Sequence, residues 1–544
     1  MNSAELSLPL FKQTDAFMKV DLKSFYASNG LIKEFLEGNL RDLHGPEFSK
    51  EEVLKFAEKR TFSMQNRIHL TEHLVSQYKN LQIESPVRKN IESLKNEKTM
   101  TVTTGHQLNI FTGPLFFIYK ILQVINITEE LNRCNNGFHF VPVFWMASED
   151  HDFEEISFFN ANRKKYKWDR VDGDAVGRMS TEGLGEILDL LKKDLGYDVH
   201  QILQVFEDYC KKDTLAHATL YLANKLFGKY GLIVLNADTN SLKNLFKETM
   251  KRELVYNKTH IEIHDVISRL DKSGYKVQVN PREINLFYLF KGKRGRIIKE
   301  NGKYKIANTS LEFTEEDLLD QLQKYPERFS PNVVMRPMYQ ETILPNLVYL
   351  GGAGEIAYWL ELKKAFDQYS ISFPILAVRN SLILIDSKSE RKMNRLHLNP
   401  SAFLQGKESL IKSFLLKKNE FMEMNEEENL LIELKRVYEQ KVKKVDSSLL
   451  PAVEASYARQ KKELERLKKK FVRALKQKYE KDIEAIEWVQ EHFFPSGDLQ
   501  ERHENVLPYL VQNGWEFLDV IKLNIGAFDQ KISFVSLNYD GNPS

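Results

Sequence analysis

The sequence predicts an α/β protein with a doubly wound core, inserted segments and an antiparallel α-helical coiled-coil arm. Three observations predict this: a strand–loop–helix–strand pattern over 100–147, short alternating strands after residue 270, and two helices with coiled-coil spacing after residue 425. The expected segments are 1–160, N-terminal helices and the first part of the core; 161–230, a connecting insertion; 231–270, core; 271–325, a small β-rich insertion; 326–400, core; 401–490, the helical hairpin; and 491–544, a return to the core.

A polar loop with two glycines follows the first expected strand, residues 100–103. A proline just after this loop suits the first turn of a helix over 114–133, and we expect Thr112 to cap that helix. The free N–H groups of the first turn then suit an anion such as a phosphate or carboxylate. The alternative is an ordinary strand-to-helix turn with a core histidine. The candidate substrate-binding residues are Gly105, Gln107, Thr112 and Gly113, and His106 is the candidate for acid/base chemistry or phosphate contact.

A second polar loop, SEDHDFEE, follows the apolar run 138–147, which is typical of a central parallel strand. Two parallel strands joined by a helix place both loops at the same edge of the sheet. Consecutive ionisable groups there are costly unless they are solvated, paired or used. They suit acid/base chemistry or, more weakly, a metal, because no HExxH or CxxC spacing occurs; the alternative is a solvated acidic turn. The candidate catalytic residues of this loop are Glu149, Asp150, His151 and Asp152.

The rest of the core is expected to contain a third parallel strand over 232–236 and another over 373–378. Between them, 275–310 reads as antiparallel strands, in which the run KGKRGR could approach a phosphate but better fits a solvated hairpin turn. A second glycine loop then precedes a helix, so it could bind an anion or nucleotide, or it could only permit a tight turn. The candidate residues here are Arg336 and Gln340 for substrate, and Gly351, Gly352 and Gly354 for a nucleotide or anion.

The arm shows apolar residues at alternating steps of three and four, which is typical of a coiled-coil seam. The turn VDSSLLP, with its serines as caps and Pro451 near the next helix start, predicts an antiparallel hairpin. Folding the hairpin about Ser448 places acidic residues 426–428 near basic residues 468–470. The expected seam is Leu431, Leu434, Tyr438 and Val445 on the first helix, and Leu450, Val453, Tyr457, Gln460, Leu464, Leu467, Phe471 and Ala474 on the second.

The composition narrows the function. The 78 basic and 76 acidic residues nearly cancel, so no overall field attracts nucleic acid or an anionic membrane. Only two cysteines occur, Cys134 and Cys210, which are too few for a disulfide framework and fit a reducing compartment. Because no apolar run reaches membrane-spanning length, we expect a cytoplasmic protein without a membrane partner.

Four motifs in one order resemble the cysteine ligases of bacillithiol biosynthesis: TGHQLNIFTGP, VPVFWMASEDHDF, SPNVVMRPMYQETILPNLVYLGGAGEIAYW and FFPSGDLQER. The resemblance covers most of the chain. It implies a Rossmann-like core with inserted segments, a coiled-coil hairpin that forms a homodimer, and a cytosolic bacterial enzyme. The implied reaction joins L-cysteine to the amino group of glucosaminyl malate.

The resemblance also implies kinship with class I synthetase-type ligases, whose HxGH motif binds nucleotide phosphates. The matching residues here are Thr103, Thr104, Gly105 and His106, so a threonine replaces the first histidine. The segment around Lys388 is similar to the mobile lysine loop of those enzymes, so Lys388 is a candidate nucleotide contact. ATP or ADP is therefore a candidate ligand, with no metal motif and with the activating chemistry left open.

We therefore expect a ligase whose site lies at the sheet edge formed by 105–113 and 149–152, with Asp150 or Asp152 binding the ammonium group of cysteine. The alternatives are a metal-assisted hydrolase or amidase built on His106, His151, Asp150 and Asp152, and a non-catalytic coiled-coil scaffold. The scaffold would explain the arm but not two polar loops at one sheet edge.

Overall fold

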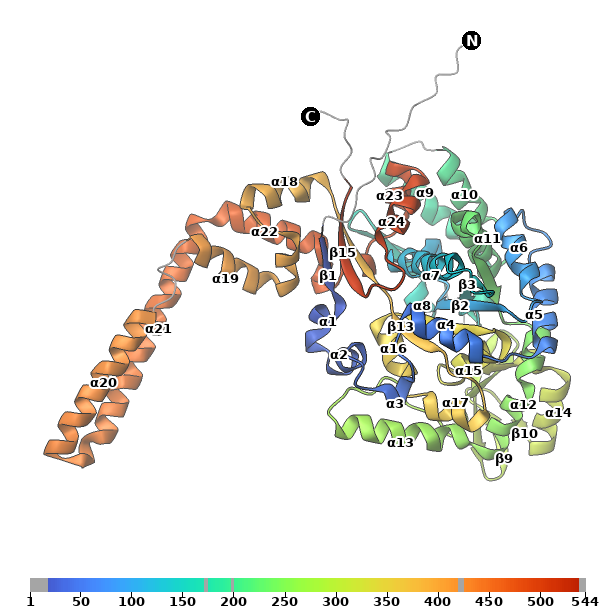
Figure 1. Ribbon diagram of the computed structural model, residues 1–544, viewed down its shortest axis with the longest axis horizontal. Coiled ribbons are helices and arrows are strands. Elements are labelled where there is room, and N and C mark those ends of the chain that lie inside the picture. The colour runs from blue at the N-terminus through green and yellow to red at the C-terminus, as the bar shows by residue number, and fades with distance from the viewer. Residues whose placement is uncertain (1–17, 171–174, 197–199, 419–424, 538–544) are drawn as a thin grey trace, which may run out of the picture. The chain divides into compact units, whose positions relative to one another are not determined.

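The computed structural model describes residues 18–170, 175–196, 200–418 and 425–537. These residues form two compact units (Figure 1). The first unit comprises 18–383 and 500–535, and the second comprises 384–499 with 536–537. Each unit is described separately below.

The first unit is built on a five-stranded parallel sheet with the order β13-β12-β2-β3-β6. Along the chain the strands run outward from β2 to one edge, and then from β12 to the other, which is the doubly wound arrangement. The predicted α/β class is thus confirmed, as are the parallel strands expected over 138–147, 232–236 and 373–378. The strands are β2 (Thr99–His106), β3 (His139–Met146), β6 (Ile233–Asn236), β12 (Asn346–Gly351) and β13 (Ile375–Val378).

Helix α7 (Phe116–Arg133) crosses from β2 to β3 and is buried around most of its circumference. Its sequence is apolar on nearly every face, as required of a helix packed between a sheet and other elements. Val124, Ile127 and Leu131 join the main apolar core, which also contains side chains of β2, β3, β12 and β13 and of α4 (Lys50–Lys59). Burying each such side chain stabilises the fold by about 1.5–3 kcal/mol.

Helices from several parts of the chain surround the sheet (Figure 1). Those before β2 include two amphipathic helices with serine N-caps, Ser49 for α4 and Ser63 for α5, so these starts follow from the local sequence. The other main helices of the unit are α2 (Gly30–Leu36), α5 (Met64–Gln77), α6 (Ser85–Ser93), α9 (Leu184–Leu195), α10 (His200–Cys210), α11 (Leu215–Phe227), α12 (Asn240–Tyr256), α13 (Lys258–Lys272), α14 (Glu315–Lys324), α15 (Met335–Ile343), α16 (Ala353–Trp359), α17 (Lys363–Tyr369), α23 (Leu507–Asn513) and α24 (Glu516–Asn524).

The β-rich insertion is a five-stranded sheet with the order β10-β9-β8-β7-β11. Its neighbouring strands pair antiparallel, which confirms the predicted strand character. Two-residue turns with positive φ, Lys291–Gly292 and Asn301–Gly302, join β7 to β8 and β8 to β9. The strands are β7 (Leu286–Phe290), β8 (Lys293–Glu300), β9 (Lys303–Ile306), β10 (Glu312–Phe313) and β11 (Phe329–Pro331).

Two smaller strand pairs complete the first unit. β4 (Phe158–Ala161) pairs antiparallel with β5 (Lys164–Lys167), and β1 (Met18–Asp21) pairs antiparallel with β15 (Lys531–Ser536). The segment expected to return to the core therefore contains a strand, β15, which lies next to the first described residues of the chain. A further strand, β14 (Ser381–Ile385), lies where the chain passes from the first unit to the second.

The second unit is helical and contains the predicted antiparallel hairpin, in which α20 and α21 pack along each other. Asp446, rather than a serine, caps the turn by accepting from the Ser448 N–H, and Pro451 lies in the first turn of α21 as expected. The expected charge pairing is present between Lys468 Nζ and Glu428 Oε1, at 3.4 Å. The helices are α18 (Ser387–Leu396), α19 (Lys407–Lys418), α20 (Asn425–Val445), α21 (Leu450–Lys478) and α22 (Glu480–Phe493).

The predicted seam divides between two faces of the hairpin. Half-buried positions lie between the helices, whereas a second set of apolar side chains is exposed, because one helix covers only one stripe of its neighbour. The half-buried predicted positions are Leu431, Leu450, Val453, Tyr457 and Leu464. The exposed ones are Leu434, Tyr438, Val445, Gln460, Leu467, Phe471 and Ala474.

Candidate functional site

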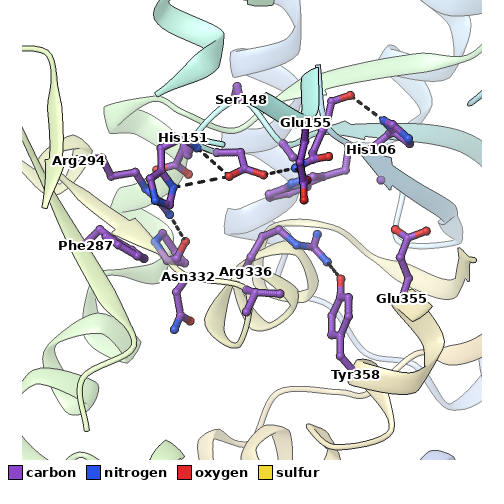
Figure 2. A pocket seen from close by; sticks show the side chains of 18 of the residues that line it. His106, Ser148, His151, Glu155, Phe287, Arg294, Asn332, Arg336, Glu355 and Tyr358 are labelled. Atoms are coloured by element: carbon purple, nitrogen blue, oxygen red, sulfur yellow. Dashed lines mark hydrogen bonds and ion pairs between the residues drawn. The ribbon is translucent and has the colours of Figure 1, made fainter. Parts of the chain in front are cut away.

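A cavity of about 910 Å³ opens at the carboxyl ends of β2, β3 and β12 (Figure 2). This is where strand order reverses, since β2 and β12 are neighbours in the sheet and lead outward in opposite directions, and open α/β sheets bind ligands at this crevice. Both predicted loops and the second glycine loop contribute to the lining. The wall opposite the sheet comes from the β-rich insertion and the segment 280–284 that leads into it.

His106 is the last residue of β2 and lines the cavity. Its ring packs against Phe116 and Phe117, and Nδ1 lies 2.8 Å from the Gln107 carbonyl oxygen. Since a carbonyl only accepts, Nδ1 carries the proton and Nε2 keeps its lone pair. Burial, reinforced by the nearby charge of Lys120, lowers the pKa of His106 to about 4. The imidazole is therefore neutral at physiological pH.

The other end of this loop differs from the prediction. Helix α7 begins at Phe116, and Thr112 does not cap it; Thr112 and its neighbour Phe111 have positive φ in a short 3-10 turn. Asn505 holds this turn by donating to the carbonyls of Phe111 and Gly113, at 2.8 and 2.7 Å. The Leu115 N–H donates to the Glu504 carbonyl, so the chain itself occupies this part of the helix start. Thr112 and Gly113 are buried and lie outside the cavity lining.

Glu149 is committed to a buried ion-pair network. Its Oε1 lies 2.5 Å from Lys243 Nζ, which also contacts Asp238 at 3.2 Å, and Asp238 pairs in turn with Arg178 at 2.7 Å. Burial raises the pKa of Glu149, while Lys243 opposes that rise. Glu149 therefore anchors the loop to α12 instead of presenting a free carboxylate to a ligand.

Asp150 does present its carboxylate to the cavity. Its Oδ2 accepts from Gln107 Nε2 at 2.7 Å, and its Oδ1 accepts from the His151 N–H at 2.7 Å. Burial acts to raise the pKa of Asp150, but the hydrogen bonds from His151 and Gln107 outweigh it and hold this pKa well below its usual range. Gln107 Nε2 also donates to Glu155 Oε2 at 2.7 Å, so one amide joins two carboxylates of the segment that follows β3.

Asp152 has a local structural role. Its side chain accepts from the Glu155 N–H at 3.4 Å as the N-cap of α8 (Phe153–Ile156), and the cavity lining does not include it. The four residues predicted as one catalytic cluster thus separate: Asp150 and His151 line the cavity, Glu149 lines it while paired to Lys243, and Asp152 caps a helix turn.

His151 meets a side chain from the β-rich insertion. Arg294 Nη1 donates to His151 Nδ1 at 2.8 Å, and the Arg294 guanidinium lies over the Phe287 ring, 3.9 Å from its centroid (Figure 2). The solvated turn expected for KGKRGR accounts only for Lys291–Gly292; Arg294, two residues into β8, points into the cavity. β-Strand alternation explains this, because successive side chains face opposite sides of β8.

The second glycine loop already holds an anion, the carboxylate of Glu355. Glu355 Oε2 accepts from the Gly352 N–H at 2.8 Å and from Lys120 Nζ at 2.9 Å, and Oε1 accepts from the Tyr349 hydroxyl at 3.0 Å. Burial alone would raise the pKa of Glu355, yet Lys120 and the Gly352 N–H hold it at about 2. The assignment of Gly351, Gly352 and Gly354 to a nucleotide or anion stays a prediction, and Glu355 competes with any such ligand. Gly352 and Gly354 line the cavity, but Gly351 does not.

Arg336, from α15, lines the cavity and donates to Gln340 Oε1 and to the Tyr358 hydroxyl, each at 3.1 Å. Gln340 is fully buried, so it orients Arg336 and does not face the cavity. Its Nε2 donates to Glu341 at 2.9 Å, and Glu341 accepts from Asn346 at 2.8 Å. This buried chain continues into β2, where Thr103 donates to Asn346 at 2.8 Å.

Several cavity residues were not predicted. Arg379 pairs with Glu501 at 2.6 Å in the core, and both are almost fully buried. Glu355 carried a usable signal, because Gly352-x-x-Glu355 has the spacing of a capping box. Tyr358 and Arg379 carried none, since a single charged or aromatic residue in an apolar helix or strand end has many structural explanations. The same holds for Lys120, which pairs with Glu355 but does not line the cavity. Lys388, the remaining nucleotide candidate, lies in the second unit over the Trp488 ring, 4.6 Å from its centroid, and does not line this cavity.

Two kinds of feature are absent from the described residues. Among those residues, no group of three or more His, Cys, Asp or Glu side chains is arranged to hold a metal ion. Within the same ranges, no helix combines the length and apolar character needed to cross a membrane.

Comparison with known proteins gives a consistent result along the chain. Residues 18–380 match the N-terminal Rossmann-like domain of the bacillithiol biosynthesis protein BshC, and residues 382–537 match its C-terminal coiled-coil domain. A protein of Flavobacterium johnsoniae named "Putative cysteine ligase BshC" is 40% identical over 533 residues, covering 96% of this chain and 100% of that protein. Proteins of the same name from Flavobacterium psychrophilum (42% identical, covering 92% of this chain and 95% of that protein) and Christiangramia forsetii (40%, covering 88% and 90%) are similarly close. The chain belongs to the BshC family of bacillithiol biosynthesis.

Proposed function

We propose that this protein is a cysteine ligase that joins the carboxyl group of L-cysteine to the amino group of glucosaminyl malate. The names of its relatives and the family support a ligase that forms an amide bond. The observation that carries the site assignment is a single cavity that combines an ionised carboxylate, Asp150, a neutral imidazole, His106, and a row of arginines. The carboxylate suits an ammonium group, the imidazole suits an attacking amine, and the arginines suit carboxylates of the substrate.

The ammonium group of cysteine binds at Asp150. The carboxylate is ionised, and Gln107 fixes its orientation while bringing Glu155 to the same place, so two acidic side chains face one point of the cavity. A charge-assisted hydrogen bond of this kind contributes about 1.5–3 kcal/mol. His151 and Arg294 lie beside these two carboxylates, on the side of the cavity formed by the insertion.

His106 contacts the attacking amine. When the amine forms the amide bond it loses a proton, and an imidazole nitrogen with a free lone pair can accept it. Nδ1 of His106 donates to the Gln107 carbonyl, which leaves Nε2 as the acceptor. The low pKa keeps this nitrogen unprotonated, and the packing against Phe116 and Phe117 fixes the ring.

Amide formation from a free carboxylate is uphill in water, so the cysteine carboxyl must be activated. ATP is our leading candidate for the activating substrate, and a nucleotide that only regulates is the alternative. The Gly352 N–H already donates to the Glu355 carboxylate. A phosphate would therefore have to displace Glu355 or bind elsewhere on the arginine-lined wall.

The test is to incubate the protein with cysteine and glucosaminyl malate, with ATP, without ATP and after metal chelation, and to follow the products by mass spectrometry. We expect the cysteine amide only when ATP or another activated donor is supplied. Amide formation without any donor would demand another energy source, and loss of product on chelation would favour metal-assisted chemistry. Absence of binding of either substrate would refute the assignment.

We also propose that the protein is a homodimer formed through its arm and that it works in the cytoplasm. The exposed apolar side chains of α20 and α21, among them Leu434 and Phe471 at 40% and 46% exposure, form a stripe that a second copy could cover. The two cysteines are free, as expected in a reducing compartment.

A further inference from the structure

The cavity carries more positive charge than its own acidic groups balance. Six arginines line it against four carboxylates. Two of the carboxylates are paired with buried lysines, Glu149 with Lys243 and Glu355 with Lys120, and one arginine, Arg379, is paired with Glu501. Within the described part of the chain, the five remaining arginines therefore face two lining carboxylates without a lysine partner, Asp150 and Glu155, and the cavity suits a ligand with more than one negative charge.

Arg294 differs from an ordinary surface arginine because all its partners are neutral. Nε donates to the Ser330 hydroxyl at 3.1 Å, Nη1 to His151 Nδ1 at 2.8 Å, and Nη2 to the Pro331 carbonyl at 3.1 Å. No carboxylate of the described chain lies within ion-pair distance of it. A guanidinium has five N–H groups, so one N–H on each terminal nitrogen is left for a ligand.

This arrangement is costly without a ligand. Burial lowers the pKa of Arg294, and the charges of Glu149, Asp150 and Asp238 offset this only in part. The side chain is nevertheless fixed, because the Phe287 ring supports one face of the guanidinium and three hydrogen bonds set its plane. A fixed guanidinium with two free N–H groups is preorganised for a carboxylate, which it can bind through two parallel hydrogen bonds.

Almost all the residues that contact Arg294 belong to the β-rich insertion. Phe287 is on β7, Arg294 on β8, and Ser330 and Pro331 on β11, which are neighbouring strands in the sheet. Only His151 comes from the doubly wound core. The insertion thus supplies a recognition group to a cavity whose candidate acid/base residue, His106, comes from the core.

We propose that Arg294 binds a carboxylate of the amine-bearing substrate and that the β-rich insertion sets the specificity for an acidic acceptor. The proposal rests on the proposed function, in which glucosaminyl malate carries two carboxylates. Arg294 takes one of them, and Arg336, whose partners Gln340 and Tyr358 are also neutral, is placed in the same cavity to take the other.

The test compares Arg294→Gln and Arg294→Lys with wild type on two acceptors, glucosaminyl malate and methyl glucosaminide, which lacks the malate. Isothermal titration gives the Kd of each acceptor, and turnover gives kcat and KM. We expect Arg294→Gln to weaken binding of glucosaminyl malate about 10- to 100-fold, with the KM for cysteine unchanged and kcat/KM for methyl glucosaminide within about twofold. Arg294→Lys should fall between wild type and Arg294→Gln, because lysine keeps the charge but not the fork.

The matched control is Lys305→Gln, which removes a positive charge from an exposed position of the same insertion, paired to Glu300 and outside the cavity. It should bind both acceptors as wild type does. Unchanged affinity of both Arg294 variants, or an equal loss for both acceptors, would overturn the inference. A wild-type protein that makes no amide under any condition would instead count against the proposed function, so the two failures are distinguishable.

Discussion

The acidic residues in the loop after β3 have different roles. Asp150 faces the cavity, receives the Gln107 amide and is held ionised, whereas Asp152 caps one helical turn. The burial and the partners of each side chain decide its role. Four consecutive ionisable residues could be predicted as a cluster, but not which of them reach a ligand.

We expect Asp150→Asn to raise the KM for cysteine about 10- to 100-fold, because it removes the charge that binds the ammonium while keeping the volume of the side chain. Asp152→Asn is the matched control and should leave that KM within about twofold, since an asparagine also caps helices. Steady-state kinetics at varied cysteine concentration measure both. If Asp150→Asn saturates with cysteine like wild type, the ammonium lies elsewhere.

We expect His106→Ala to lower kcat about 10²- to 10⁴-fold without unfolding the protein. The reason is the loss of the unprotonated Nε2 at the end of β2. Turnover and far-UV circular dichroism should be measured on the same preparation, with His264→Ala on the exposed surface of α13 as the control. Retained turnover would remove His106 from the mechanism, whereas a lost helix signal would show that the ring is needed only for packing against Phe116 and Phe117.

The elements show where prediction from sequence succeeds. The strand–loop–helix–strand order was readable because apolar runs, glycines and a proline act locally. The start of α7 was not, since Asn505 and Glu504, almost 400 residues further along the chain, hold the turn that Thr112 was expected to cap. The position of Arg294 could not be predicted either, because a shift of one residue in the register of β8 would turn its side chain away from the cavity.

Glu341, a buried carboxyl group on helix α15, should make the stability of the protein depend on pH. Burial raises the pKa of Glu341 to about 7 from an ordinary value near 4.5, and its Oε2 has no partner among the described residues. Between these two values the folded protein holds a proton that the unfolded chain releases, so the free energy of unfolding falls as the pH rises from 4.5 to about 7 and levels off above that value. The full effect is about 3 kcal/mol at pH 8 relative to pH 4.

Glu341→Gln should therefore flatten the dependence of Tm on pH between about 4.5 and 8, and should raise Tm at the alkaline end. The amide keeps an acceptor for Gln340 and Asn346 and cannot ionise. Differential scanning calorimetry across this range measures the change, with Glu316→Gln on α14, which is exposed, as the control. An unaltered slope would mean that Glu341 is not protonated in the folded state near pH 6.

At the scale of the whole molecule, the doubly wound order explains why motifs far apart in the sequence meet. Residues 105–107, 149–151 and 352–355 follow three strands that are neighbours in the sheet, so their loops share one edge. The sequence allowed the first two to be placed together through a single strand–helix–strand unit. Joining the third to them required the order of all five strands, which no local pattern contains.

The arm carries the prediction about assembly. Replacing Leu434 and Phe471 together by glutamate should convert a dimer into a monomer of 63.6 kDa, because four buried charges would oppose the association of two copies. Light scattering of the purified variant measures this, and Lys441→Gln, an exposed change on the same helix, should leave the mass unaltered. A dimer that persists would place the association surface outside this stripe.

The pairing of β2 with β12 has a consequence for how the protein acquires activity. The hydrogen bond from Thr101 to Asn346 joins residues separated by 245 positions, and the cavity opens at the carboxyl ends of the two strands that it links. Contacts so distant in sequence must close a very long loop, and such closures slow folding, whereas helices form early from local contacts. On dilution from denaturant, the far-UV helix signal should therefore recover before turnover does. The lag between the two signals measures how long β2 and β12 take to pair.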